Sequence, residues 1–192
     1  MKLPDDNLQL QSLLPHQHKA LCYVKEIASR KRLHALDILK GIFHRAGVEE
    51  AALDEAMMGI CTHAQVMLHF HPDRLCVKRL SVAQALLQEG CYRNQFETGL
   101  STGSLTAFIG GERDLWEKEL FGGAYHLPGV SVADRPRYGT LDLMHHPDGP
   151  APRFGSCYFV LRKAISNRCS FTFSGNQSPM VFDQSGTLDV ME

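Results

Sequence analysis

Apolar residues recur at helical spacing along the first part of the chain, up to about residue 62. Three amphipathic stretches are visible: Leu21–Ala28, Leu36–Phe43 and one from about residue 49 to 64. Pro15 suits the first turn of a helix because its φ angle is already fixed, and Gly47 is a plausible stop. The pattern predicts an N-terminal helical segment over residues 1–62.

The pattern changes near residue 63, where alternation typical of strands begins. In residues 66–71, Val66, Leu68 and Phe70 share one face, and Met67, His69 and His71 share the other. Two helices are predicted between the strands, one over Val77–Glu89 and one starting at Asp114, with Glu117 closing a capping box. The other predicted strands are 138–143, the apolar run 156–161, which is typical of a central strand, and 169–174.

Glycine content agrees with this change. Of the 16 glycines in the chain, 11 lie between Gly90 and Gly155, so turns should dominate that part. We expect an α+β fold with two parts: the helical segment 1–62, followed by a split, mostly antiparallel β-domain over 63–192. Hydrophobic residues make up 44% of the chain, enough for a packed core.

Charge and cysteine usage narrow the class of protein. The chain carries 20 Lys and Arg against 21 Asp and Glu, a net charge of -1, so it gives no strong nucleic-acid signal. It contains no apolar run long enough to span a bilayer and no secretory signal, which predicts a cytoplasmic protein without membrane contact. The six cysteines form no C-x-x-C pair, and a reduced state is expected.

The densest polar cluster is His69-Phe70-His71-Pro72-Asp73-Arg74. Two histidines two residues apart on a strand share a face, and such a pair can bind a metal, hold an anion or orient a sugar hydroxyl. Arg74 is a fork-shaped donor suited to phosphate. The alternative is a strand-end cap next to one core histidine with satisfied hydrogen bonds.

The second cluster runs from Tyr92 to Gly103 and includes Arg93, Glu97, Ser101 and Thr102. Its glycines allow close backbone approach to a ligand, but the pattern is neither a Walker loop nor a dinucleotide fingerprint. A loop whose polar groups satisfy one another explains it equally well. Tyr125 follows a Gly-Gly turn, either as a ring presented to a ligand or as a core residue.

Several longer strings resemble an uncharacterised bacterial family, domain of unknown function 3626. They are HFHPDR (69–74), YRNQFETGLSTGSLTA (92–107), LFGGAY (120–125), RPRYGTLDL (135–143), HPDGPAPRFGSCYFVL (146–161) and RCSFTF (168–173). The resemblance runs from about residue 60 to the C-terminus. This family implies no activity.

A more distant resemblance is to ADP-ribosyltransferases, which clamp NAD in a small, split β-structure. It implies NAD as substrate, with His69 or His71 at the ribose and Arg74 or Arg93 at a phosphate. It further implies that Tyr125 stacks on the nicotinamide and that Ser101 and Thr102 brace the site. The protein would hold the ribose and diphosphate while a carboxylate stabilises the oxocarbenium-like state.

The carboxylate is where the chain departs from that pattern. Transferases place a catalytic Glu late in the chain, and after Glu119 the only glutamate here is Glu192. Glu97 is the substitute that we predict, although it comes earlier than expected. The resemblance therefore implies a C-terminally shortened or inactive relative, with secretion as an effector and an unknown macromolecular target both open.

Three other classes compete with the transferase. A co-chaperone is suggested by His71-Pro72-Asp73, the tripeptide of J-domains, but Glu49–Leu68 carries four acids and no Lys or Arg where a basic helix is needed. A metal-dependent hydrolase would draw on clustered histidines from separate segments, without a recognised zinc motif, and we predict no metal site. A non-catalytic interaction protein is the third.

Overall fold

The computed structural model describes residues 12–76, 79–99, 107–173 and 184–190. Helix α1 spans Pro15–Arg45 and helix α2 spans Glu50–His63. Pro15 opens α1 as predicted, and the Gln17 side chain reaches back to accept a hydrogen bond from the Leu14 N–H at 3.1 Å. The two amphipathic stretches expected before Gly47 form one continuous helix, because no residue between them breaks the backbone hydrogen bonding. Gly47 follows in the left-handed region at φ 69°.

A three-stranded antiparallel sheet forms the middle of the molecule, in the order β2-β1-β3. Strand β1 (Gln65–Phe70) lies between β2 (Thr140–Asp142) and β3 (Cys157–Val160). Val66 is opposite Leu141 in β2, and Leu68 is opposite Phe159 in β3. A second sheet pairs β4 (Ser170–Thr172) with β5 (Ser185–Thr187).

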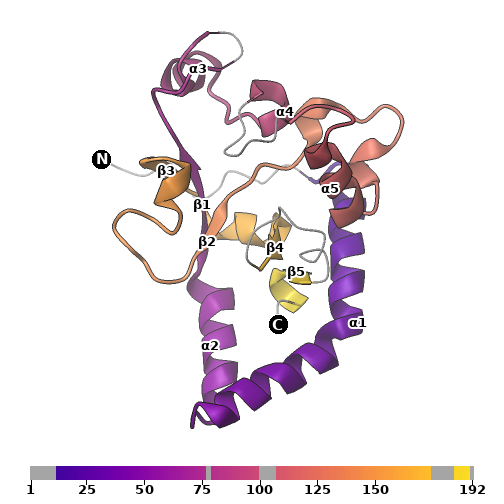
Figure 1. Ribbon diagram of the computed structural model, residues 1–192, viewed down its shortest axis with the longest axis vertical. Coiled ribbons are helices and arrows are strands. Elements are labelled where there is room, and N and C mark those ends of the chain that lie inside the picture. The colour runs from indigo at the N-terminus through magenta and orange to yellow at the C-terminus, as the bar shows by residue number, and fades with distance from the viewer. Residues whose placement is uncertain (1–11, 77–78, 100–106, 174–183, 191–192) are drawn as a thin grey trace.

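The remaining α-helices of the described residues lie between β1 and β2 in the chain. They are α3 (Val82–Glu89), α4 (Gln95–Thr98) and α5 (Glu112–Leu120). Figure 1 shows α1 running down one side of the molecule and along its base, and α2 returning toward the sheet. The two helices thus frame β4 and β5, while α3 and α4 lie at the opposite end.

A cluster of buried apolar residues joins α1 to α5 and the short helical turn that follows α5. Its buried members are Ala20 and Val24 of α1 with Leu120, Phe121, Ala124 and Tyr125. Gly122 is required here, because a Cβ at this position would come within 2.5 Å of the Tyr23 ring. The N-terminal helix and the β-containing part therefore share one core.

Two helix starts predicted from the sequence were wrong. The helix expected over Val77–Glu89 begins at Val82, because Ser81 caps it: the Gln84 N–H donates to Ser81 Oγ at 3.1 Å. Residues 77–78 of that prediction lie outside the described residues. The helix expected from Asp114 begins at Glu112 after Gly111, so Asp114 lies inside it and is free to face the interior.

The strands form where they were predicted, but the strand expected at the centre of the sheet lies at its edge. The run 156–161 was expected to be a central strand, whereas β3 is an edge strand with Phe159 42% exposed. The central place belongs to β1, whose residues Val66 to His69 are all buried. The described helices and antiparallel strands confirm the α+β class. Because these strands are short, the second part contains less β-structure than expected. Because residues 65–70 form a strand, the J-domain hypothesis, which needs a helix there, is wrong.

Candidate functional site

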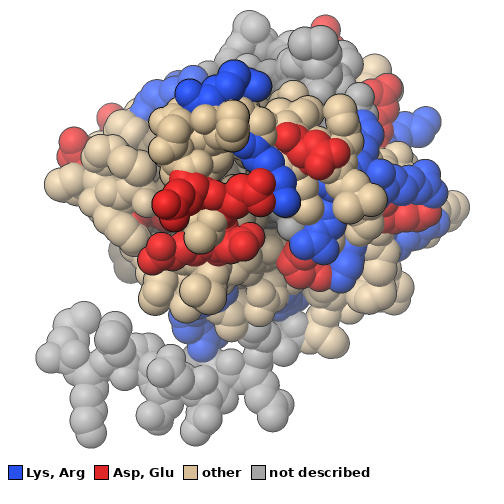
Figure 2. All heavy atoms as spheres, turned by 90° about the horizontal axis from the view of Figure 1, so that it is seen from below, with Lys and Arg blue, Asp and Glu red and all other residues tan. Residues whose placement is uncertain are grey.

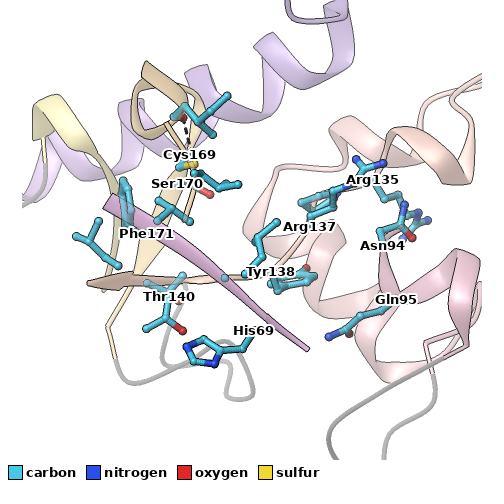
Figure 3. A pocket seen from close by; sticks show the side chains of 18 of the residues that line it. His69, Asn94, Gln95, Arg135, Arg137, Tyr138, Thr140, Cys169, Ser170 and Phe171 are labelled. Carbon is cyan, nitrogen blue, oxygen red and sulfur yellow. Dashed lines mark hydrogen bonds between the residues drawn. The ribbon is translucent and has the colours of Figure 1, made fainter. Parts of the chain in front are cut away.

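A cavity of about 1630 Å³ lies between α1, the central sheet and the helices α3 to α5. Ligand pockets usually measure about 300–1,000 Å³, so this space is large enough for a dinucleotide. Figure 3 shows Arg135, Arg137, Tyr138, Asn94 and Gln95 on one side of it and β4 residues on the other.

Six of the residues predicted from the sequence border this cavity. They are His69, His71, Arg74, Arg93, Glu97 and Tyr125. Ser101 and Thr102 lie outside the described residues. The structure therefore places side chains from near residue 70, from near residue 95 and from residue 125 around one space, although their roles there differ.

His69 has a structural role. Its Nδ1 lies 2.9 Å from the Gly155 carbonyl oxygen, and its Nε2 lies 3.3 Å from the Ala151 N–H. A carbonyl oxygen only accepts and an amide N–H only donates, so the ring is neutral with its proton on Nδ1. Both nitrogens are thus used, and His69 holds residues 151–155 against β1.

His71 has no structural partner of this kind in the part of the chain that the structure describes. It follows the end of β1, is half-buried, and borders the cavity. Its ring makes no hydrogen bond to any residue that the structure describes. Arg74, three residues on, is exposed and forms no ion pair within the described part of the chain. Both side chains thus border the cavity with polar groups that no described residue engages.

Glu97 and Arg93 bind each other. Glu97 Oε2 accepts from the Asn94 N–H at 2.9 Å, and Oε1 accepts from Arg93 Nη1 at 2.7 Å. Arg93 also pairs with Glu89, and the hydrogen bonds to Glu89 and Glu97 raise the pKa of the Arg93 guanidinium. The capping-box geometry makes Glu97 first of all a helix-stabilising residue, with its carboxylate fixed at the cavity wall.

Tyr125 is a core residue that reaches the cavity. Only 9% of it is exposed, and its ring meets Phe121 edge-on at 5.2 Å between centroids. Burial, with the charges of Glu117 and Asp134 nearby, raises the pKa of the Tyr125 phenol to about 12. The phenol therefore stays neutral at physiological pH.

A buried charged cluster around α5 was not predicted from the sequence. Arg135 Nη1 lies 2.5 Å from Asp114 Oδ1 and 3.0 Å from Glu117 Oε2. The Tyr138 hydroxyl donates to Glu117 Oε1 at 2.5 Å, and the Arg113 guanidinium lies 4.9 Å from the centre of the Tyr138 ring. Arg113, Arg135 and Tyr138 border the cavity, with the two carboxylates behind them.

The pKa values of the two carboxyl groups in the cluster are shifted in opposite directions. Burial alone would raise the pKa of Asp114, but the Gly110 N–H and Arg135 outweigh burial and hold this pKa below its ordinary value. Burial raises the pKa of Glu117 despite the opposing hydrogen bonds from Tyr138 and Arg135. Perturbed titration of buried groups at a cavity is typical of functional sites.

One sequence signal pointed to this cluster. Asp114 and Glu117 lie one turn apart on a helix whose other residues are mostly charged, and this spacing was interpreted as a helix cap. The same spacing puts both acids on one face, where Arg135 meets them. Nothing local in the sequence identifies Arg135 as their partner.

Other features of the candidate site can be placed as well. Among the described residues, no three His, Cys, Asp or Glu side chains gather as a set able to hold a metal ion. The metal-dependent hydrolase gains no support from them. None of the described helices is long and apolar enough to cross a bilayer. On the face shown in Figure 2, acidic and basic side chains lie next to each other and neither sign covers the surface.

Comparison with known proteins gives one match. The family model described as protein of unknown function (DUF3626) matches residues 65–192, from the start of β1 onward. No curated protein and no solved structure matches the chain. Because the model covers more than half of the chain, the chain belongs to this family.

Proposed function

We propose that this DUF3626 protein binds NAD in the cavity between α1, the central sheet and α3 to α5, as an ADP-ribosyltransferase-like domain. One observation supports the proposal above the others: side chains suited to ribose, phosphate and aromatic recognition converge on this space from distant segments. They include His71, Arg74, Arg113 and Tyr138. The size of the cavity fits a dinucleotide.

His71 and Arg74 form the part of the cavity wall where ribose and a phosphate would be held. The imidazole has its ring nitrogens available, and either can accept from or donate to a ribose hydroxyl. Arg74 carries a charge that no described carboxylate neutralises, and a guanidinium binds phosphate in a bidentate manner. Arg93, the other predicted phosphate contact, is already neutralised by Glu89 and Glu97 and is the weaker candidate.

Tyr125 was predicted to stack on nicotinamide. Its ring packs in the core against Phe121 and only 9% of the residue is exposed, so little of it is available to a ligand. In the proposed complex it forms the apolar floor beneath the nicotinamide. Ser101 and Thr102 remain predicted contacts.

The chemistry that we propose is cleavage of the bond between nicotinamide nitrogen and ribose C1′. The bonding electron pair leaves with nicotinamide, which departs neutral, and water or a target nucleophile forms the new bond at C1′ and loses a proton. Glu97, fixed by Asn94 and Arg93 at the cavity wall, supplies the negative charge that stabilises the developing cation. Its ion pair with Arg93 weakens this effect, so we expect slow turnover.

Purified full chain would be tested for NAD binding by calorimetry and for nicotinamide release by chromatography. We expect binding, with His71→Ala weakening it about tenfold and Glu97→Gln abolishing release while leaving binding in place. Leu87→Ala, an 88% exposed position on α3, is the matched control. Binding without release would leave an NAD-binding domain without transferase activity, and absence of binding would reject the proposal.

A further inference from the structure

Arg113 carries a buried guanidinium with an unused donor. The residue is 4% exposed and borders the cavity, and its Nε finds no hydrogen-bond partner within the described structure. The guanidinium carbon lies 4.9 Å from the centre of the Tyr138 ring and 5.6 Å from that of Trp116. Stacking on aromatic rings orients a guanidinium but leaves the N–H groups at its edge unsatisfied.

The nearest carboxylates are occupied by other groups. Asp114 accepts from the Gly110 N–H at 2.8 Å and contacts His126 at 2.9 Å and Arg135 at 2.5 Å. Glu117 is bound by Arg135 and Tyr138. An unsatisfied buried donor is costly, and the cost is larger for a charged group. The Arg113 guanidinium lies near the Glu117 carboxylate and the Tyr138 hydroxyl, but its buried Nε has no described partner and is a donor that an anion would satisfy.

A second unpaired polar atom borders the same cavity. Gln95 Oε1 is buried and has no hydrogen-bond partner among the residues described. Figure 3 shows the Gln95 side chain extending from α4 toward the space between that helix and β1. An amide offers an acceptor and a donor, and rotation exchanges them. Arg137, exposed on the same wall, adds positive charge.

We propose that Arg113 and Gln95 form a subsite for the diphosphate of a nucleoside diphosphate. Arg113 donates to a phosphate oxygen, and Gln95 Oε1 accepts from the adjacent ribose hydroxyl. This subsite would bind the ADP part of NAD, so it extends the proposed function. It rests on that proposed function only for the identity of the complete ligand. It adds a phosphate contact on α5 to the one proposed at Arg74 and involves no contact from Arg93, which Glu89 and Glu97 already neutralise.

The test uses the fluorescence of Trp116, the single tryptophan, which lies beside Arg113. ADP, inorganic pyrophosphate and adenosine would be titrated separately into the full chain. We expect ADP and pyrophosphate to bind and adenosine not to bind. In Arg113→Gln, both affinities should fall by about 10- to 100-fold, because a charge-assisted hydrogen bond is lost. Arg153→Gln, an exposed arginine that also borders the cavity, should bind like the wild type.

Gln95 provides the second variant, because Arg113→Gln changes a buried residue and its folding must be checked by thermal melting. Gln95→Glu places a negative charge next to the phosphates and should weaken both ligands, whereas Gln95→Ala should weaken ADP and spare pyrophosphate. Wild type that binds neither ADP nor pyrophosphate, or folded Arg113→Gln and Gln95→Glu that bind both normally, would overturn the subsite. ADP and pyrophosphate binding without NAD binding would reject the proposed function alone, and Arg113-independent NAD binding would reject the subsite alone.

Discussion

The buried Arg135 guanidinium is the most informative place to perturb the molecule. It is 4% exposed, pairs with Asp114 and Glu117, and packs 4.2 Å from the centre of the Phe96 ring. Arg135→Met keeps most of the volume and the contact with Phe96 but removes the charge. Two buried carboxylates then lose their cation.

The magnitude follows from that loss. Breaking a buried ion pair by removing one partner costs about 3–5 kcal/mol. For a chain of this length each kcal/mol lowers the melting temperature by about 2–4 °C, so Arg135→Met should melt about 6–20 °C below the wild type. Arg137→Met is the matched control, because Arg137 is exposed and lies 4.0 Å from its nearest acid, Glu97. We expect that variant to lose about 1 kcal/mol or less.

The penalty should depend on pH with a definite sign. The lowered pKa of Asp114 contributes stability that is present above its unfolded pKa and lost as pH falls through the folded pKa. The raised pKa of Glu117 contributes stability below its unfolded pKa that is lost as pH rises through the folded pKa. Arg135 lowers both values, so without it both carboxyl groups protonate at higher pH.

The difference between Arg135→Met and wild type should therefore be largest near pH 7 and shrink as the solution is acidified toward the ordinary carboxyl range. Urea unfolding followed by circular dichroism at several pH values measures it. A penalty no larger than that of Arg137→Met, or one that grows on acidification, would refute the interpretation of this cluster as charged and mutually compensated.

Three further results are expected. Gly155→Ala should strongly lower the melting temperature, because a Cβ there would lie 2.0 Å from the Phe70 carbonyl carbon. The control is Gly129→Ala, which is also at positive φ but has open space around it and should cost about 1 kcal/mol. Equal losses of stability in the two variants would contradict the packing argument. His69→Ala should lower the unfolding free energy by about 2–4 kcal/mol, since it leaves the Gly155 oxygen and the Ala151 N–H unpaired. His71→Ala should melt like the wild type. If His71→Ala were the more destabilising of the two, His71 and not His69 would be the structural histidine. Cys169 is half-buried and burial raises its pKa to about 11, so it should react with a thiol reagent more slowly in the native than in the unfolded protein; equal rates at this residue, followed by peptide mass spectrometry, would contradict this.

Much of the secondary structure could be predicted from the sequence, because its signals are local. Pro15 begins α1, the residues around Gly47 end it, and the alternation after residue 64 marks β1. Gly90 ends α3 in the left-handed region at φ 61°. Each of these signals acts over a few residues, through backbone angles and side-chain periodicity. The same locality explains the error at Ser81, where a capping box outweighed the periodic pattern before it.

The sequence by itself determined which segments are mainly helical or extended and that polar side chains gather near residues 70 and 95. Tertiary structure alone decided what those residues do. His69 binds a carbonyl 86 positions away and becomes structural, whereas His71 borders the cavity without a described hydrogen-bond partner. Glu117 binds Arg135, which comes 18 positions later in the chain, and Asp114 binds the same arginine. The two acids that the sequence suggested as part of a helix cap therefore lie behind the arginines of the cavity wall. The physical reason is that burial and hydrogen bonding depend on which groups the folded chain brings together, and a local pattern contains no record of those partners.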